Sequence, residues 1–428
     1  MRGVLQTVAQ SSIIGRITAA ELGQQQAQAA VGARDRCYSA NEDMPHRTNS
    51  RSRSIGNDVQ VIVLARGKGE RLRPFTLNRP KALCPICNSS ILNRLLAQIG
   101  AAGFRSVTLS LPSSLPTEDW ASARREFPRN LEVIERPALK PANGSFGAVR
   151  QCLDSSCSRV LVVYGDSFLK SDLARLLRRH DRWHLKDRAV ATVLYHRPDD
   201  LLVPGEDGRT YHGIMSCEKS GRVNRFEEKP LVSDVKPGFD LANAAVFIIE
   251  RSVFRDPLFR RAADFSRHFF EPAINGGAQV VYGLEIGRDG YRHDLGGLQR
   301  FFEGNMNVLS GRWKAPIPGR QILPGVWCEP GVALKGATVI PPVAIARGVS
   351  LHPGCVVGPM VALGDSCIVG ENVRVSNSVV MCGTYLAPGA EVLDSVIGAH
   401  CRVGQGVLLP PHSFIGDFAA LGFIPSNS

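Results

Sequence analysis

The sequence predicts an α/β domain followed by a parallel β-helix. Apolar runs of strand length alternate with helical stretches over residues 59–315, which predicts a mixed, mostly parallel sheet with helices on both faces. From about residue 325 the apolar period changes to six, which neither a helix nor a simple strand produces. We therefore divide the chain into an N-terminal extension over 1–58, the α/β domain over 59–315 and the β-helix over 316–428.

The elements of the α/β domain follow from the apolar pattern. Strands are expected at residues 59–65, 106–111, 159–163, 189–195, 242–249 and 279–284. Helices are expected at 91–102, 171–180 and 298–309. In such sheets ligands bind at the carboxyl ends of the strands, and a glycine-containing loop follows the first strand here.

The six-residue repeat predicts a left-handed coil of triangular section, with one hexad on each side. Two apolar sets carry it: Val339, Ile345, Leu351, Val357, Leu363, Val369, Val375 and Met381, and Val343, Val349, Cys355, Val361, Cys367, Val373 and Val379. We expect Cys355 and Cys367 to point into the prism as small apolar fillers. The register is expected to run unbroken from 339 to 385 and to slip near Leu393–Ile397.

The N-terminal extension, residues 1–58, is polar and of low complexity, so we expect it to be disordered or dispensable. A transit peptide and a translation start at Met44 are alternatives. No run of about 18 apolar residues is present, so no membrane span is expected. The 11 cysteines are scattered without a secretory signal, which favours reduced thiols in a cytoplasmic protein. Cys84 and Cys87 are interpreted as buried apolar side chains, with metal binding a distant second.

The charge of the chain is concentrated in the α/β domain. Of the net +12, residues 1–58 carry +2 and residues 316–428 carry −1, which leaves +11 on residues 59–315. A basic domain of this kind suits acidic ligands such as nucleotides and sugar phosphates. Nucleic acid is the alternative, but the chain has no helix-turn-helix, zinc-finger or aromatic RNA-binding signature.

The loop after the first strand has the composition of a polyphosphate site. Gly67 and Gly69 allow a tight turn and close approach of a ligand. Successive N–H groups in such a turn form an anion site, to which Arg71 and Lys81 add positive charge. An ordinary turn with solvated basic residues is the alternative interpretation. The loop is not a Walker motif, because no Gly-Lys-Ser/Thr follows Gly69.

With Arg-Leu-x-Pro-x-Thr and Arg-Pro-Lys-Ala-Leu at fixed distances, this loop resembles the signature of the sugar-phosphate nucleotidyltransferases, the nucleoside-diphosphate-sugar pyrophosphorylases, in a form similar to mannose-1-phosphate guanylyltransferases. Four further strings resemble the same family, at residues 162–166, 226–230, 241–245 and 291–296. The resemblance implies a Rossmann-like nucleotidyltransferase domain, to which a β-helix is a common appendage.

The resemblance also implies a reaction. A sugar-1-phosphate oxygen attacks the α-phosphorus of a nucleoside triphosphate in line, and pyrophosphate leaves. Mg²⁺ would bridge the phosphates, and its protein ligands would be carboxylates. The residues implied are, for catalysis, Arg71, Lys81 and Asp166; for the nucleotide, Ala65, Gly67, Gly69, Gly144 and Ser145; for the sugar phosphate, Glu228, Lys229 and Asn243; and for the metal, Asp166 and Asp294.

The sequence departs from the family at Arg66, Glu70, Phe146 and Gly297. Arg66 and Phe146 are bulky where a nucleotide would approach, and Glu70 adds negative charge beside phosphates. A catalytically inactive regulatory subunit that binds a nucleotide sugar is therefore the alternative function. A less favoured one adds acyltransferase activity in the β-helix, with His352, His400 and His412 as candidate bases. Side-by-side packing of such β-helices makes a homo-oligomer the expected assembly.

Overall fold

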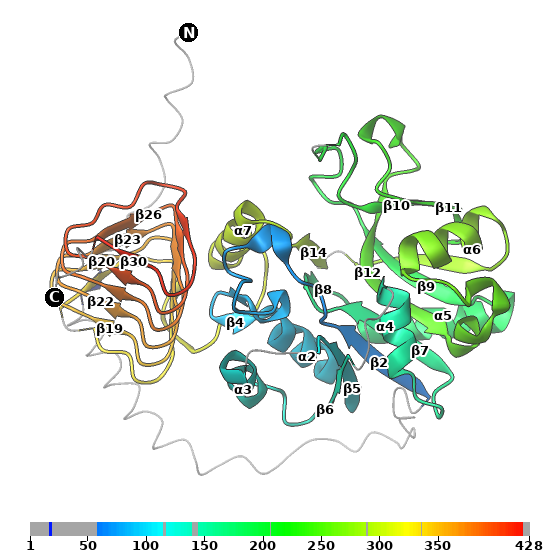
Figure 1. Cartoon of the computed structure of the whole chain (residues 1–428), viewed down its shortest axis with the longest axis horizontal. Coiled ribbons are helices and arrows are strands. Elements are labelled where there is room, and N and C mark those ends of the chain that lie inside the picture. The colour runs from blue at the N-terminus through cyan, green and yellow to red at the C-terminus, as the bar shows by residue number, and fades with distance from the viewer. Residues whose placement is uncertain are drawn as a thin grey trace, which may run out of the picture.

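The computed structural model describes residues 17–18, 58–113, 117–138, 144–205, 207–287, 290–334 and 336–422. An α/β domain and a β-helix lie beside one another, joined by a short connection after helix α7 (Figure 1). Of the segment 1–58 that the sequence predicts to be disordered or dispensable, Ile17, Thr18 and Asp58 are described and the rest lies outside the described residues. Ile17–Thr18 forms strand β1, which pairs antiparallel with Thr338–Val339 of the β-helix.

The α/β domain is built on a nine-stranded mixed sheet with the order β11-β10-β12-β7-β2-β5-β6, and β9 and β13 join through β12. Strands β6, β5, β2 and β7 run parallel, whereas β12 is antiparallel to β7, β9 and β10. The strands are β2 Val59–Leu64, β5 Ser106–Leu111, β6 Glu132–Pro137, β7 Arg159–Tyr164, β9 Ala191–His196, β10 Gly213–Cys217, β11 Val223–Glu228, β12 Leu241–Glu250 and β13 Val281–Glu285.

Helices cover both faces of this sheet, as the alternating pattern predicts. Alternate residues of β2 divide between the faces: Val61 and Val63 pack beneath α2, α3 and α5, whereas Ile62 and Leu64 pack beneath α4 and α6. The helices are α2 Ile91–Ala101, α3 Thr117–Arg125, α4 Gly144–Cys152, α5 Leu173–Asp187, α6 Glu271–Asn275 and α7 Leu298–Leu309. Within the described residues no helix is both long and apolar enough to cross a bilayer.

Two smaller strand pairs accompany the main sheet. Strand β8 (Ser167–Lys170) pairs antiparallel with β14 (Tyr291–Asp294). Strand β3 (Pro85–Ile86) pairs with β4 (Ser89–Ser90), directly before α2. The β8–β14 pair joins segments that are more than a hundred residues apart in the sequence, and it places Asp294 opposite Ser167.

The C-terminal domain is a three-sided stack of short parallel strands, as expected of a β-helix (Figure 1). Its sense of winding, left-handed, stays a prediction. One side holds β17 Thr338–Val339, β20 Val356–Val357, β23 Arg374–Ser376 and β26 Glu391–Leu393. The second begins with β15 Arg320–Leu323, which is antiparallel to its neighbour, and continues with the parallel strands β16 Val326–Cys328, β18 Val343–Ile345, β21 Val361–Leu363, β24 Ser378–Val380, β27 Val396–Ile397 and β29 Phe414–Ile415. The third holds β19 Ser350–Leu351, β22 Ile368–Val369, β25 Tyr385–Leu386, β28 Arg402–Val403 and β30 Ala420–Leu421.

The six-residue period holds over most of the coil, but it slips earlier than predicted. Val343 pairs with Val361, 18 residues on, whereas Val361 pairs with Ser378, only 17 residues on. The missing residue turns Val380 into the prism, and Val379 and Met381, predicted to lie inside, pack outside it. The prediction of an unbroken register to 385 is therefore wrong. Strands β26 and β27 make the second slip, as expected, and the interior position of Cys355 and Cys367 is confirmed.

An apolar layer joins the two domains. The outward side chains Ala344, Ala362, Val379 and Val396 of the β-helix pack against Leu72, Phe75, Ile86 and Phe301 of the α/β domain. Cys84 and Cys87 are fully buried in the same layer, which confirms their interpretation as buried apolar side chains. A buried ion pair crosses it too: Arg79 Nη2 lies 3.4 Å from Asp417 Oδ2, and the two side chains are 7% and 2% exposed.

Candidate active site

The predicted polyphosphate loop, called the phosphate loop below, begins at Ala65 and contains Gly67 and Gly69. It leaves β2 at its carboxyl end and folds back over Lys81. The Ala65 N–H donates to the carbonyl of Ser110, 2.9 Å away, which fixes the start of the loop to the neighbouring strand. Gly69 has φ 64°, and a Cβ there would lie 2.9 Å from Thr76 Cγ2 and 3.0 Å from Lys81 Cβ. Only glycine therefore allows this loop to pack closely on Lys81.

Asp166 and Asp294 are brought together by strand pairing. Asp166 follows the carboxyl end of β7 and directly precedes β8. In the β8–β14 pair Asp294 is the partner of Ser167, so it lies beside Asp166 although the two are far apart in the sequence. Gly67 lies next to Asp166, since a Cβ at Gly67 would be 3.7 Å from Asp166 Oδ2. The strand pairing therefore brings both predicted metal ligands to one place.

Lys81 links the two carboxylates. Its Nζ lies 3.1 Å from Asp166 Oδ2 and 3.1 Å from Asp294 Oδ1, and its side chain is 6% exposed. Burial opposes the charged ammonium, but the charges of Asp166 and Asp294 outweigh it and raise the pKa of Lys81. Burial also opposes the charged form of Asp294, yet Lys81 and Arg292 hold the pKa of this carboxyl well below its usual range. Lys81 and Asp294 are thus both charged at neutral pH, at a strand end that borders a cavity.

Two cavities open on this cluster and share Arg71, Lys81 and Asp166. The first, of about 550 Å³, is lined by the phosphate loop, including Lys68, Gly69 and Glu70. The second, of about 490 Å³, extends to β11 and β12. Arg71 is 62% exposed and its Nη2 lies 3.8 Å from Asp294 Oδ2, so its guanidinium is free to turn toward an anion in either cavity.

The predicted sugar-phosphate residues line the second cavity together. Asn243 lies where β12 bulges, and its Oδ1 accepts from the N–H of Ala245, 2.8 Å away. Lys229 follows β11 with φ 53°, which turns the chain back along the cavity wall. Burial raises the pKa of Glu228. A hydrogen bond from Ser266 and the positive charge of Lys229 act in the opposite direction but do not cancel this rise. A buried carboxyl beside an ammonium and an amide suits a ligand that carries both hydroxyls and a phosphate.

The predicted nucleotide residues Gly144 and Ser145 begin α4. Gly144 has φ 62°, and a Cβ there would lie 2.5 Å from the carbonyl oxygen of Ala263, so only glycine fits. Ser145 lines the second cavity, and its Oγ accepts from the N–H of Phe265, 3.2 Å away. Ala65, Gly67 and Gly144 contribute no atoms to the walls of either cavity.

Three of the departures from the family, Arg66, Glu70 and Phe146, differ in their surroundings. Phe146 is fully buried in the core beneath α4, with its ring 4.8 Å from that of Phe254 and 5.0 Å from that of Phe265. The expectation that Phe146 crowds the nucleotide is therefore wrong. Arg66 donates to Gln151 Oε1 on α4, 3.1 Å away. Glu70 lines the first cavity, with Oε1 4.0 Å from Lys68 Nζ, so it is the departure that faces the phosphate side.

Sequence reasoning missed two residues of the second cavity. Arg292 lines it, its Nη1 lies 3.3 Å from His212 Nδ1, and it has no ion pair within 4.0 Å among the described residues. Tyr211 lies between two cations, with its ring centroid 6.0 Å from Arg71 Cζ and 4.7 Å from Arg300 Cζ. Arg292 stands two residues before Asp294, in a string that already resembled the family. Tyr211 lies in a loop without any motif.

Asp166 and Asp294 fit a magnesium site. Both offer carboxylate oxygens, the ligands that Mg²⁺ prefers, and both lie at a cavity wide enough for waters and phosphates. Because both approach one ammonium at 3.1 Å, they already share a single cation.

The three histidines of the β-helix do not form a site together. The N–H of His352 donates to Val369 O, that of His400 to Cys382 O and that of His412 to Asp394 O, which puts each at a different corner of the prism. The geometry therefore offers no shared acyl-transfer centre of these three rings.

Comparison with known proteins agrees with this geometry. Residues 60–311 match the nucleotidyl transferase family, and residues 339–421 match the GMPPB C-terminal domain. A mannose-1-phosphate guanylyltransferase of Mycobacterium tuberculosis is 28% identical over 66% of this chain and 75% of its own length. A UTP–glucose-1-phosphate uridylyltransferase of Synechocystis is 24% identical (80% and 88%), and a glucose-1-phosphate adenylyltransferase of Alkalilimnicola ehrlichii is 26% identical (83% and 89%). The chain is thus a member of the nucleotidyl transferase family.

Proposed function

We propose that this chain transfers a nucleotidyl group from a nucleoside triphosphate to a sugar-1-phosphate and releases pyrophosphate. The observation that carries the proposal is the cluster of Lys81, Asp166 and Asp294, which lies where the phosphate cavity meets the sugar cavity. The sugar-phosphate oxygen attacks the α-phosphorus, the bond from this phosphorus to the bridging oxygen breaks, and the leaving group departs with that oxygen as pyrophosphate.

The protein's part in this reaction is to position two polyanions and to neutralise their charge. Lys81 and Arg71 hold the triphosphate and stabilise the negative charge that develops as the bond breaks. Because both cations border both cavities, they reach the α-phosphate from the side on which the second substrate arrives. Positioning of this kind supplies most of the catalysis in phosphoryl-type transfers.

Asp166 and Asp294 would hold the metal ion, which we propose to be Mg²⁺. When bound, the ion supplies a Lewis acid that neutralises the phosphate oxygens. Lys81 keeps the two carboxylates close together through its paired contacts. Replacement of either aspartate removes negative charge from this cluster and leaves the buried ammonium with one partner.

The sugar-1-phosphate would lie against β11 and β12. Lys229 binds its phosphate, while Glu228 and Asn243 accept and donate bonds to its hydroxyls. Ser145 borders the side on which the base would lie. The three relatives above carry guanylyl, uridylyl and adenylyl transfer in their names, so we leave the base and the sugar to experiment. A homo-oligomer in the cytoplasm is part of the same proposal.

The alternative function is a regulatory subunit that binds a nucleotide sugar without turning it over. Glu70 is the observation that favours it, because a carboxylate on the phosphate cavity repels a triphosphate.

Pyrophosphate release decides between the two. The full chain is assayed with Mg²⁺, with each common nucleoside triphosphate crossed against mannose-, glucose- and N-acetylglucosamine-1-phosphate. A productive pair that is lost in Asp166→Asn, but kept in Asp234→Asn at an exposed position, supports the enzyme. No release from any pair, with nucleotide-sugar binding retained, would support the regulatory subunit.

A further inference from the structure

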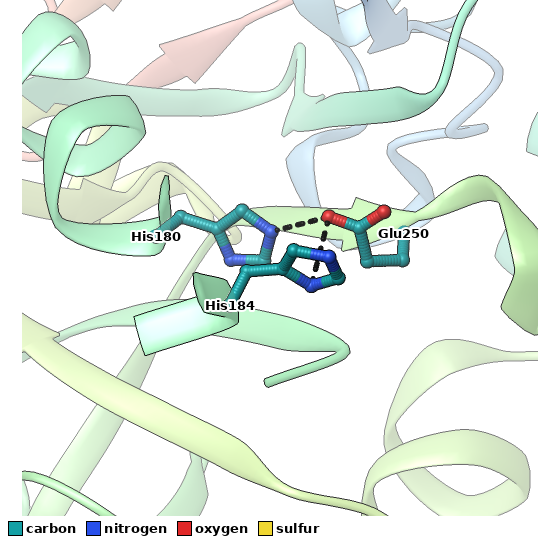
Figure 2. Close-up of side chains that lie close together, drawn as sticks. All are labelled: His180, His184 and Glu250. Atoms are coloured by element: carbon teal, nitrogen blue, oxygen red, sulfur yellow. Dashed lines mark hydrogen bonds and ion pairs between the residues drawn. The ribbon is translucent and has the colours of Figure 1, made fainter. Parts of the chain in front are cut away.

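Two histidines and a glutamate gather at the end of the sheet away from the catalytic cavities. His180 and His184 lie one turn apart on α5, and Glu250 is the last residue of β12 (Figure 2). Asn243, on the cavity wall, precedes Glu250 by seven residues, a separation of about 20 Å along an extended strand. The cluster is therefore no part of the catalytic site.

The donor atoms of this cluster are spaced as the ligands of one metal ion. Glu250 Oε1 lies 3.0 Å from His180 Nε2 and 3.4 Å from His184 Nδ1. One donor atom from each residue lies within 4.8 Å of the others. Bonds of ~2.0–2.2 Å to a tetrahedral zinc ion put neighbouring ligand atoms about 3.4 Å apart. Small movements thus bring all three onto one ion.

The cluster is enclosed by the protein. His180 is fully buried, and its Nε2 faces Glu250 Oε1 at 3.0 Å. The ion-pair partners of Glu250 within the described part of the chain are these two rings, and its side chain is only 12% exposed. A buried carboxylate is costly without a positive partner, and a neutral imidazole is the form that binds a metal.

The surroundings orient the rings. Thr192 on β9 lies 2.9 Å from His180 Nδ1, which leaves Nε2 facing Glu250. A partner behind the ligand, fixing the ring in this way, is typical of metal-binding histidines. His184 Nδ1 lies 2.9 Å from the carbonyl oxygen of Ala189. The His184 side chain is 34% exposed, so water can replace the ring as the hydrogen-bond partner of this carbonyl when the ring turns toward a metal ion.

We propose that His180, His184 and Glu250 bind a zinc ion, with water as the fourth ligand, and that this ion fastens α5 to the sheet. Two nitrogens and one carboxylate oxygen form a donor set that suits Zn²⁺ better than Mg²⁺ or Ca²⁺. The open fourth position lies on the side of His184, where the cluster reaches solvent. A hydrogen-bonded network without metal is the competing explanation.

The test uses the full-length protein, stripped with a chelator and titrated with Co²⁺ and then Zn²⁺. The proposal expects one intense visible Co²⁺ spectrum per chain, typical of four-coordinate geometry, without the ultraviolet bands that thiolate ligands add. Zn²⁺ should abolish this spectrum and raise the Tm in proportion to the logarithm of its concentration. Octahedral Co²⁺ at the two aspartates absorbs only weakly, so the catalytic site does not imitate the result.

Variants assign the signal to this cluster. His184→Gln and Glu250→Gln should lose the intense spectrum, while the control His352→Gln, on the β-helix, should keep it. Thr192→Val should weaken zinc binding by ~10–100-fold, because it removes only the partner behind His180.

Two results would overturn the proposal. A wild-type Co²⁺ spectrum as weak as that of His184→Gln, with a Tm indifferent to Zn²⁺, would leave a hydrogen-bonded network. Zinc binding that survives in both His184→Gln and Glu250→Gln would place the ion elsewhere. Neither result depends on whether the chain transfers nucleotides.

Discussion

The α/β domain and the β-helix reach the same parallel pairing by different means. In the β-helix each parallel strand pairs with one 17 or 18 residues away, so the position of a side chain follows from local spacing. In the α/β domain the candidate catalytic cluster joins Lys81, Asp166 and Asp294, and the pairing of β8 with β14 places the two aspartates side by side. The comparison teaches that the repeat produces a regular stack of strands, whereas the irregular connections of the α/β domain bring together the charged side chains of the candidate active site.

The largest effect should come from the cluster itself. We expect Asp166→Asn to lower kcat/KM by about 1,000-fold, because loss of one charged group at a reacting phosphate costs ~10²–10³ or more. Unfolding should change little, because Asp166 stays 32% exposed. Pyrophosphate release and Tm, measured together, test this. An unchanged rate at limiting Mg²⁺ would remove Asp166 from the metal site.

The ion pair between the domains should come next. Asp417→Asn removes the buried carboxylate that lies 3.4 Å from Arg79, and loss of one partner of a buried ion pair typically costs ~3–5 kcal/mol of unfolding free energy. Because Arg79 lies two residues before Lys81, we also expect the KM for the nucleotide to rise about tenfold. The control is Glu329→Gln, which breaks a pair with the 72% exposed Arg347 on the same β-helix. Equal effects of both variants would refute a special role of the Arg79–Asp417 pair.

A cavity inside the prism should separate stability from activity. Leu363→Ala removes a fully buried side chain and should cost ~2–5 kcal/mol in denaturant unfolding. The matched change in the α/β domain, Leu161→Ala, lies in the strand that leads to Asp166. We expect kcat/KM to be kept in the first variant and reduced in the second. A loss of activity in both variants would show that activity in the α/β domain depends on the stability of the β-helix.

The smallest effect concerns pH. Because burial raises the pKa of Glu228, this carboxyl holds its proton at a higher pH than it would in water. A sugar hydroxyl that donates to it favours the ionised form, so affinity for the sugar-1-phosphate should rise with pH through this pKa and then level. Glu228→Gln should show a flat profile in the KM for the sugar-1-phosphate. An unchanged slope in that variant would assign the titration to another group.

Much of the fold could be predicted because apolar periods are local. Strand β5 and helix α7 have the predicted bounds. Helix α5 runs on to Asp187, beyond the predicted end at residue 180. Its buried leucines, Leu173, Leu176 and Leu177, all lie in the first half of the helix, so the apolar pattern fades before the helix ends at Arg188, which has φ 55°. The slip at Ser378 escaped prediction because Val379 and Val380 are equally apolar, so the sequence alone does not say which faces inward.

The site could be predicted where the residues stand in strings that resemble the family, and not elsewhere. Asp166 and Asp294 lie together as the resemblance implied. The orientation of Phe146 depends on the phenylalanines of a segment a hundred residues away. The pairing of Arg79 with Asp417 joins the two ends of the described chain. Such contacts depend on tertiary packing that no local pattern records.

The apolar outer face formed by Ala344, Ala362, Val379 and Val396 makes the β-helix more than an appendage. A side of a free-standing prism would be polar, whereas this one resembles half of a domain core. A chain nicked between α7 and β15 should consequently stay together as two fragments that co-purify. Either domain expressed alone should aggregate, and co-expression with the other domain should restore its solubility.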